Sequence, residues 1–303
     1  MEDSTKAVAD HYDNSAETYH LQYEGASLSD ISKPYPSNYF RMHLLINSFI
    51  KYELKKVIEV GVGEGTPLVK LAKAGMDVSG FDVSKKMVKV AKSNFKKNSL
   101  QPSKISWGDI QDPMTYPNHL SEGKFDGLLA MGVMPHVRND EFVLKNMRNM
   151  VREGGRVFIE FRNKLFSLFT FNRYTREFIV EDLLSGVSEE LKETVSNDLE
   201  KRLEMDEPTP RLKVKSQNHN EKDVIGYDAM LSKFHNPFEV EALFKKIGFS
   251  EINFLWYHYH PAMPFLNSKK TSLFRNEALK LEHETSGWKG LFLCSAFVVE
   301  ATV

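Results

Sequence analysis

The stretch that decides the fold runs from Lys56 to Asp82 and reads KVIEVGVGEGTPLVKLAKAGMDVSGFD. It contains a short apolar run, three alternating glycines, a helical pattern of apolar residues, and a second apolar run that ends in an acid. This order predicts a strand, a glycine turn, a helix and a second strand. Such a βαβ unit binds nucleosides in many proteins, so we expect an α/β fold with a nucleoside site at this turn.

Each part of the stretch has a chemical reason. Glycines allow a tight turn and let a ligand approach the main chain closely. We expect Thr66 to cap the helix and Pro67 to be its first residue, because proline lacks the N–H that would be unpaired there. The free N–H groups at the helix N-terminus suit an anionic group of a ligand. Asp82 lies where a carboxylate can accept hydrogen bonds from both hydroxyls of a ribose.

Two kinds of cofactor fit a glycine turn of this type. A dinucleotide fingerprint needs glycine or alanine where this chain has Thr66, which disfavours a dehydrogenase. The spacing E-x-G-x-G-x-G, which begins at Glu59, resembles motif I of the class I S-adenosylmethionine (SAM) methyltransferases. The resemblance implies that the loop lies under the methionine part of SAM and that the acid after the second strand binds its ribose. The residues that it assigns to the cofactor here are Glu59, Gly61, Gly63, Gly65, Asp82 and Val83.

Two later segments resemble the same family. Gly108-Asp109-Ile110 follows a predicted third strand; the resemblance implies that Asp109 binds the adenine amino group and that Ile110 packs on the ring. A predicted fourth strand ends at Met131, which the resemblance places with the following turn beside the methyl-bearing sulfur. The implied fold is a doubly wound, Rossmann-like sheet of seven mostly parallel strands, with the last strand antiparallel.

The chain divides into four predicted segments. Residues 1–55 form N-terminal helices that include a lid, and residues 56–162 form the SAM-binding core. Residues 163–235 are a helical insertion after strand five, which is too long for a bare connection. We expect its apolar stripe to pack on the rest of the protein and the insertion to cap the substrate site. Residues 236–303 complete the core sheet.

The lid is predicted from an amphipathic, tyrosine-bearing helix at residues 5–24. Many small-molecule methyltransferases that this chain resembles fold a similar aromatic helix over the cofactor. Tyr12 and Tyr19 are the candidates for contact with SAM. The alternative is that these tyrosines only pack against the sheet.

Methyl transfer requires alignment of the acceptor with the sulfonium methyl, and a hydroxyl acceptor usually needs a base. His136 is the first candidate, because the family places a residue there beside the methyl and imidazole titrates near neutrality. A purely structural histidine is the alternative. His260, in the last long connection, is the second candidate, and its neighbour His258 is a candidate for substrate binding.

A metal site is not expected. His258 and His260 form an H-x-H pair, but no acidic partner lies nearby in the sequence. The metal-dependent catechol-type methyltransferases carry an acid at the end of strand four, where this chain has Met131-Gly132.

The substrate side is predicted from basic and aromatic residues. Arg162 and Arg173 follow strand five and offer a planar fork for a carboxylate or phosphate. The alternative is that they are solvated or hold the insertion in place. Tyr257, like His258, lies in the last connection. An anionic small molecule is therefore the expected acceptor.

The bulk composition narrows the function further. The chain has 303 residues and a net charge of −1, and this balance does not suggest a wide surface for nucleic acid. Its one cysteine, Cys294, lies in an apolar pattern and is expected to be buried. The acidic N-terminus does not resemble a secretory signal, and no run is long enough to span a membrane. We expect a soluble, cytoplasmic protein without membrane or nucleic-acid partners; its oligomeric state is left open.

Together these observations predict a metal-independent SAM-dependent methyltransferase that acts on oxygen or nitrogen of a small molecule and releases S-adenosylhomocysteine (SAH). Oxygen is slightly favoured. A nucleic-acid methyltransferase is disfavoured, because base-amino enzymes carry an Asn- or Asp-Pro-Pro-aromatic motif where this chain has Gly-Val-Met-Pro-His. A SAM-binding regulatory protein without methylation activity remains the alternative.

Overall fold

The structure, a computed structural model, describes residues 3–15, 23, 28, 30, 32–33, 35–117, 120, 125–203, 231–267 and 271–303. Tyr19 and the second half of the predicted N-terminal helix lie outside these residues. So do residues 204–230 of the predicted insertion.

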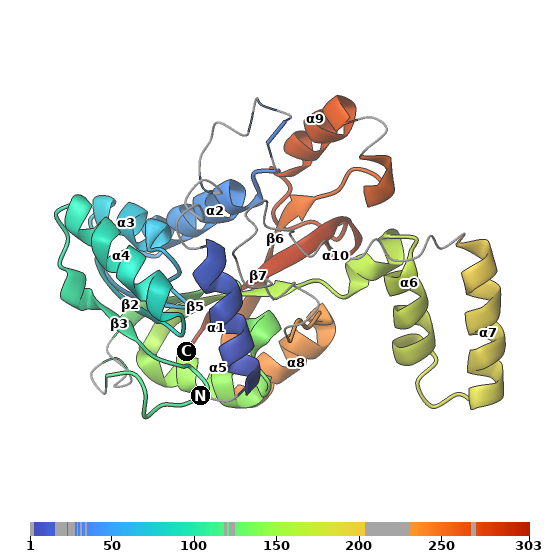
Figure 1. Cartoon of the computed structure of the whole chain (residues 1–303), viewed down its shortest axis with the longest axis horizontal. Coiled ribbons are helices and arrows are strands. Elements are labelled where there is room, and N and C mark those ends of the chain that lie inside the picture. The colour runs from blue at the N-terminus through green and yellow to red at the C-terminus, as the bar shows by residue number, and fades with distance from the viewer. Residues whose placement is uncertain are drawn as a thin grey trace, which may run out of the picture.

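A seven-stranded sheet organises the described residues, with the order β3-β2-β1-β4-β5-β7-β6 (Figure 1). Neighbouring strands from β3 to β5 pair in parallel, and β7 runs antiparallel to both β5 and β6. The predicted fold class is therefore confirmed. The strands are β1 (Lys56–Val60), β2 (Asp77–Asp82), β3 (Ile105–Trp107), β4 (Phe125–Ala130), β5 (Val151–Arg162), β6 (Ser250–Tyr259) and β7 (Cys294–Thr302).

Helices cover both faces of the sheet, and side chains alternate between two apolar cores. Val57 of β1 packs with the helices on one face, whereas its neighbour Ile58 packs with those on the other. One face carries α2 (Ser37–Lys51), α3 (Thr66–Lys73) and α4 (Lys85–Lys97), and the other carries α5 (Asp140–Met150) and α8 (Pro237–Ile247). Cys294 is fully buried, as predicted.

The remaining helices lie outside these two layers. α1 (Asp3–Ser15) contacts α4, α9 (Thr271–Leu281) contacts β6, and α10 (Gly290–Leu293) leads into β7. The short 3-10 turns are η3 (Pro102–Lys104), η5 (Met134–His136), η6 (Leu165–Phe169) and η9 (Pro264–Leu266).

The start of α3 differs from the prediction. Gly65, in the left-handed conformation with φ of 88°, is the capping residue, so Thr66 is the first residue of the helix and Pro67 the second. The Glu64 carboxylate accepts hydrogen bonds from the backbone N–H and the hydroxyl of Thr66, at 3.3 and 2.9 Å. A glutamate therefore takes the capping role that was predicted for the threonine.

The start of β5 is irregular. α5 ends at Met150 and β5 begins at Val151, so Gly154 and Gly155 lie inside the strand. The register between β4 and β5 shifts between Phe125 and Gly127, which makes room for the extra residues.

The insertion contains α6 (Arg173–Glu177), the π-helical turn η7 (Phe178–Leu183) and α7 (Glu189–Arg202). In Figure 1, α6 and α7 stand well to one side of the sheet. Ser196 is the buried residue of α7, and Leu191 of the apolar stripe is 50% exposed. Leu184, Val187, Val195 and Leu199 of the same stripe are half-buried, and α7 contacts α6 and η7, so the described part of the stripe is packed in part.

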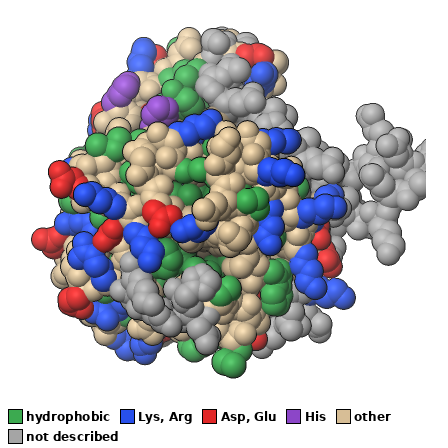
Figure 2. Space-filling view, turned by 90° about the vertical axis from the view of Figure 1, so that its left-hand side faces the viewer, with side chains coloured by type: hydrophobic (Ala, Val, Ile, Leu, Met, Phe, Trp, Pro, Cys, Tyr) green, Lys and Arg blue, Asp and Glu red, His purple; other side chains and the backbone are tan. Residues whose placement is uncertain are grey.

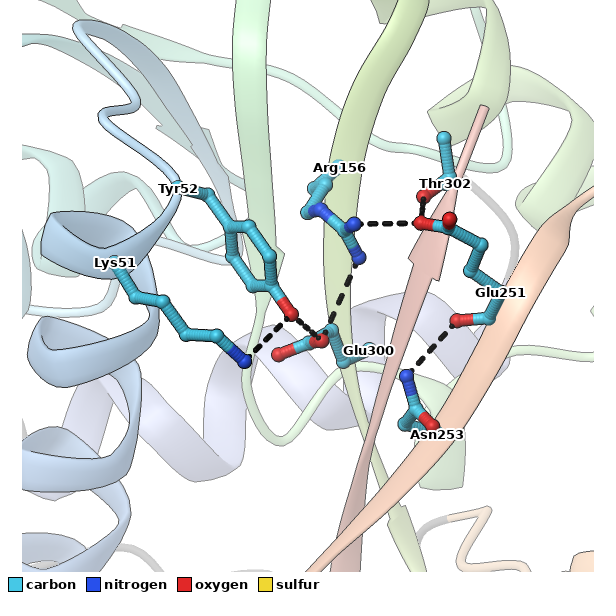
Figure 3. Close-up of polar contacts among 7 residues, drawn as sticks. All are labelled: Lys51, Tyr52, Arg156, Glu251, Asn253, Glu300 and Thr302. Carbon is cyan, nitrogen blue, oxygen red and sulfur yellow. Dashed lines mark hydrogen bonds and ion pairs between the residues drawn. The ribbon is translucent and has the colours of Figure 1, made fainter.

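The end of α2 is joined to the sheet by the polar cluster in Figure 3. The Tyr52 hydroxyl donates to Glu300 of β7 at 2.6 Å, and the Arg156 guanidinium stacks 3.7 Å from the centre of the Tyr52 ring. Arg156 also pairs with Glu300 at 3.5 Å and with Glu251 of β6 at 2.6 Å. One helix and three strands therefore meet at this cluster.

Acidic and basic side chains are interspersed on the face shown in Figure 2, which is the left-hand side of Figure 1. This is the mixed pattern expected from a net charge of −1. No helix among the described residues is both long and apolar enough to cross a membrane.

Candidate active site

A cavity opens at the carboxyl ends of β1, β2 and β4, with α1 along one side of it. It encloses about 880 Å³, part of it open to solvent. In open α/β sheets this edge is where ligands bind. The predicted cofactor residues in its lining are Tyr12, Glu59, Gly61, Gly63, Asp82, Val83, Asp109, Ile110 and Met131, and the predicted base His136 lies there too.

The glycine turn gives the cavity its floor. The backbone N–H groups of Gly61 and Val62 donate to the Phe81 carbonyl at 2.9 and 3.1 Å, which fastens the turn to β2. Gly61 has φ of +73°, and a Cβ there would lie 2.5 Å from a methyl group of Val133. Gly63 also has positive φ, but a Cβ there would meet no atom within 4 Å among the described residues. The backbone at Gly63 is therefore open to a ligand.

Gly65 is not part of the cavity lining. A Cβ at this position would lie 3.3 Å from the Cβ of Ala91, so the glycine lets α3 pack closely on α4. The structure thus gives Gly65 a packing role and does not support its predicted contact with the cofactor.

Asp82 is a buried carboxylate held by the backbone. Its two oxygens accept from the N–H groups of Gly63 and Ser84, both at 2.8 Å. Burial raises the pKa of Asp82 to about 6, although these hydrogen bonds act in the opposite direction. Each oxygen retains a second lone pair, so the carboxylate can accept from two neighbouring hydroxyls.

Glu59 is almost fully buried, and its Oε2 has no hydrogen-bond partner among the described residues. Burial raises the pKa of Glu59 well above its ordinary value, and the charge of Arg41 only partly offsets this. A buried acceptor without a partner is costly, so the site suits a ligand that donates to it. A cationic ammonium group would satisfy Glu59 best.

Asp109 and Ile110 line the end of the cavity that β3 borders. One Asp109 oxygen accepts from the backbone N–H of Gln111 at 2.9 Å, and the Ile110 side chain is buried. Gly108 before them is needed for packing, because a Cβ there would lie 2.6 Å from Tyr116.

Contacts of α1 with the core close one side of the cavity. Thr5 and Tyr12 of this helix belong to the lining, and Gln111 donates to the Thr5 hydroxyl at 3.2 Å. Asp13 accepts from the Ser84 hydroxyl at the start of α4. The predicted lid helix therefore lies over the cavity with Tyr12 in its lining.

His136 has a defined orientation. Its Nδ1 lies 2.7 Å from the Leu231 carbonyl oxygen, and its Nε2 lies 3.2 Å from the Tyr12 hydroxyl. A carbonyl can only accept, so Nδ1 carries the proton and the lone pair of Nε2 accepts from the Tyr12 hydroxyl. Burial, with smaller contributions from Arg162 and His11, lowers the pKa of His136 to about 4. The imidazole is therefore neutral at physiological pH.

The candidates from the last connection lie on the other half of the sheet, outside the cavity lining. Tyr257 donates to Glu160, and His258 bonds to Ser295 at 2.8 Å. The His260 imidazole has no hydrogen-bond partner among the described residues, and burial lowers its pKa to about 3. The structure does not bring His260 to His136, so it does not support His260 as a second base.

The two arginine candidates also lie outside the lining. Arg162 donates to the Ser232 hydroxyl at 2.5 Å, and Arg173 lies over the ring of its neighbour Tyr174. The structure does not bring the two side chains together as one fork.

One polar contact beside the cavity was missed by sequence reasoning. Arg41 of α2 pairs with Glu160 of β5 at 2.7 Å and also donates to the hydroxyl of the cavity residue Tyr23 at 3.2 Å. Burial acts to raise the pKa of Glu160, but Arg41 and Tyr257 hold it below its ordinary value. An arginine within a helical pattern gave no signal that it would be buried opposite this acid.

No cluster of three or more potential metal ligands is present among the described residues. The glycine floor, the carboxylate at the end of β2 and the nearby His136, on a seven-stranded sheet with an antiparallel β7, are the features of the class I SAM-dependent methyltransferase fold.

Comparison with known proteins agrees. The chain belongs to the methyltransferase domain family, whose model matches residues 51–228. It is 30% identical over 132 residues to a ubiquinone biosynthesis O-methyltransferase of Pelagibacter ubique, covering 43% of this chain and 52% of that one. It is 33% identical over 105 residues to the methyltransferase GfsG of Streptomyces halstedii, covering 34% and 36%. The chain thus spans about half the length of the ubiquinone biosynthesis relatives. It spans 36% of the length of GfsG.

Solved structures share the fold. Magnesium protoporphyrin IX methyltransferase (ChlM) from Synechocystis PCC 6803, crystallised with SAH, matches with a TM-score of 0.53 at 13% identity over 98% of both chains. At this identity the likeness shows the fold alone.

Proposed function

We propose that this methyltransferase methylates a hydroxyl oxygen of a small molecule and that His136 is the general base. The observation that carries the proposal is the orientation of His136 in the cavity, with Nδ1 bonded to a carbonyl and Nε2 unprotonated. An imidazole held in this way can take a proton from a hydroxyl acceptor. An amine that is neutral at working pH has less need of such a base.

The cavity residues fit SAM, whose sulfonium supplies the methyl group. Glu59 would hold the ammonium of the methionine part, and the open backbone at Gly63 would let that part approach the turn. Asp82 would hold the ribose hydroxyls, and Asp109 and Ile110 the adenine. These assignments rest on the unpartnered Glu59 oxygen, the free space at Gly63 and the spare lone pairs of Asp82.

In this proposal His136 Nε2 accepts the hydroxyl proton as the oxygen attacks, and the Leu231 carbonyl steadies the imidazolium that forms. Arg162 lies close enough to lower the pKa of His136, so its positive charge also acts on an oxygen that becomes negative beside the imidazole. The contacts of α1 close one side of the cavity and so limit the access of bulk water.

The acceptor class is supported by two observations. Relatives named ubiquinone biosynthesis O-methyltransferase favour oxygen over nitrogen. Arg162 lies close enough to His136 to lower its pKa, so the same charge would attract an acidic group of an acceptor held beside the imidazole. We further propose that the insertion at residues 163–235 covers the acceptor, with Tyr257 and His258 at the far end of its site.

The test uses SAM tritiated on the methyl group and three probes. These are 3,4-dihydroxybenzoate, its methyl ester, which lacks the charge, and 3,4-diaminobenzoate, which replaces oxygen by nitrogen. We expect most transfer to 3,4-dihydroxybenzoate. His136→Gln should lower kcat about 10²–10⁴-fold with SAH affinity nearly unchanged. His43→Gln, at an exposed histidine of α2, is the matched control and should leave kcat unchanged.

Three outcomes would contradict the proposal. Preferred transfer to the diamine would reverse the choice of acceptor atom. Full activity of His136→Gln would remove the base. Tight SAH binding without transfer to these probes or to any component of a metabolite extract would favour a regulatory SAM-binding protein.

A further inference from the structure

The chain returns from the insertion through residues 231–235, here named the return strap, which passes beside the turn that carries His136. The Leu231 carbonyl accepts from His136 Nδ1 at 2.7 Å, and the Lys233 N–H donates to the Pro135 carbonyl at 2.8 Å. The strap therefore touches both the imidazole and the backbone of η5. It is the strap, not the core sheet, that supplies the acceptor for Nδ1.

The far end of the strap is fixed to β5. The His235 N–H donates to the Arg162 carbonyl at 2.8 Å, and the His235 carbonyl accepts from the Lys164 N–H at 2.9 Å. This is one rung of parallel pairing, between Asn163 and His235. In addition, the Arg162 side chain donates to the Ser232 hydroxyl.

Asp140 holds the middle of the strap. It is the first residue of α5 and follows the His136 turn by four positions. One of its oxygens pairs with Lys233 Nζ at 2.5 Å, and the other lies 3.4 Å from Nε2 of the buried His235. Burial acts to raise the pKa of Asp140, but His235 and Lys233 hold it below its ordinary value. The carboxylate therefore stays charged and can hold both strap residues.

We propose that the return strap is a positioning device for the base, and that Lys233 and Asp140 are its positioning residues. The ion pair between them keeps the Leu231 carbonyl against His136 Nδ1, which fixes the tautomer in which Nε2 is the base. The inference rests on the proposed role of His136. It goes beyond that role because it makes the end of the insertion part of the methyl-transfer machinery.

The first test measures the tautomer directly by ¹⁵N NMR of histidine-labelled protein with SAH. The His136 signals are those absent from the His136→Gln variant. We expect wild-type His136 in the Nδ1–H tautomer, which is the less populated form of free histidine. The Nε2–H tautomer in the wild type would overturn the proposal without any variant.

The second test removes the ion pair with Lys233→Met. We expect a mixture of His136 tautomers and a fall in kcat with 3,4-dihydroxybenzoate of at least about tenfold, since small displacements of a catalytic group are costly. SAH affinity should stay within about twofold, because neither Lys233 nor Asp140 lines the cofactor cavity. Lys245→Met is the control, because it removes an exposed ion pair of α8, between Lys245 and Glu241, with the same N–O distance of 2.5 Å. It should change neither the tautomer of His136 nor kcat.

A double-mutant cycle separates this proposal from the role of His136 itself. If Lys233 acts through the imidazole, Lys233→Met should cause no further loss of kcat in the His136→Gln background. If Lys233→Met keeps the wild-type tautomer and kcat, the proposed role of the strap is wrong, whereas the proposed role of His136 as the base is not affected. Full activity of His136→Gln would show that His136 is not the base. Asp140→Asn, which removes the same ion pair from the other side, is the second variant if Lys233→Met does not fold.

Discussion

At the scale of single residues, the site depends on two acids, Glu59 and Asp82, whose burial is not evident from their sequence motifs. The place of Asp82 could be predicted, because an acid at the end of a parallel strand lies at the edge of the sheet where ligands bind. That of Glu59 was predicted from the resemblance to motif I. Their burial, and the resulting rise in the pKa of both, could not be predicted, because burial depends on how segments distant in the sequence pack around the two carboxyl groups.

Asp82→Ala should weaken SAH binding by about 1–3 kcal/mol, the cost of losing a hydrogen bond to a charged group. The wild-type affinity should rise from pH 5 to pH 7, because Asp82 with a pKa of about 6 gains its full acceptor capacity as it ionises. Titration calorimetry at several pH values measures both effects. The alanine variant is the control and should lose this pH dependence; equal affinity of variant and wild type would remove Asp82 from the site.

At the scale of elements, the turn between β1 and α3 joins fold and function. Periodicity and glycine spacing predicted the two strands and the helix, since these depend on local sequence. The cap was predicted wrongly, because the carboxylate of Glu64 reaches the N-terminus in place of the Thr66 side chain. Gly65 was assigned to the ligand, whereas its position against Ala91 is decided by the packing of two helices.

Two alanine substitutions should separate fold from binding at this turn. Gly61→Ala places a Cβ 2.5 Å from Val133 and should lower the free energy of unfolding by about 2 kcal/mol or more. Gly63→Ala meets no atom of the described residues within 4 Å, so it should cost only the left-handed strain of about 1–2 kcal/mol. It should nevertheless weaken SAH binding, since the new methyl group occupies cavity space.

Urea denaturation and SAH calorimetry on both variants measure these effects. Gly63→Ala with wild-type affinity would show that the ligand does not approach this backbone. Equal loss of stability in the two variants would contradict the packing argument at Gly61.

At the scale of the whole molecule, short apolar runs that alternate with helical patterns predicted an α/β sheet covered by helices. The antiparallel β7 was predicted from the resemblance to the methyltransferase family. It did not predict how the insertion is arranged. The apolar stripe of α7 pointed to burial, yet Leu191 is half exposed. The return strap gave no local signal, because Leu231, Lys233 and Asp140 act only through contacts between separate segments.

The polar cluster of Figure 3 also joins segments that are far apart in the sequence. Tyr52→Phe should lower the free energy of unfolding by about 1–3 kcal/mol, because the buried Glu300 loses a hydrogen bond at 2.6 Å. Lys51→Met removes the exposed lysine that bonds to the same hydroxyl and should change stability by no more than about 0.5 kcal/mol. Urea denaturation measures the free energy of unfolding of both variants. If Tyr52→Phe leaves it unchanged, this cluster does not hold α2 to the sheet.

The central claim is that the cavity at the ends of β1, β2 and β4 binds SAM, with His136 beside the transferred methyl. A crystal structure with SAH tests this most directly. The account predicts the ribose hydroxyls on Asp82, the methionine part over Gly61 and Gly63, and the thioether sulfur facing the turn that carries His136. SAH bound elsewhere, or bound here with its sulfur directed away from His136, would contradict it.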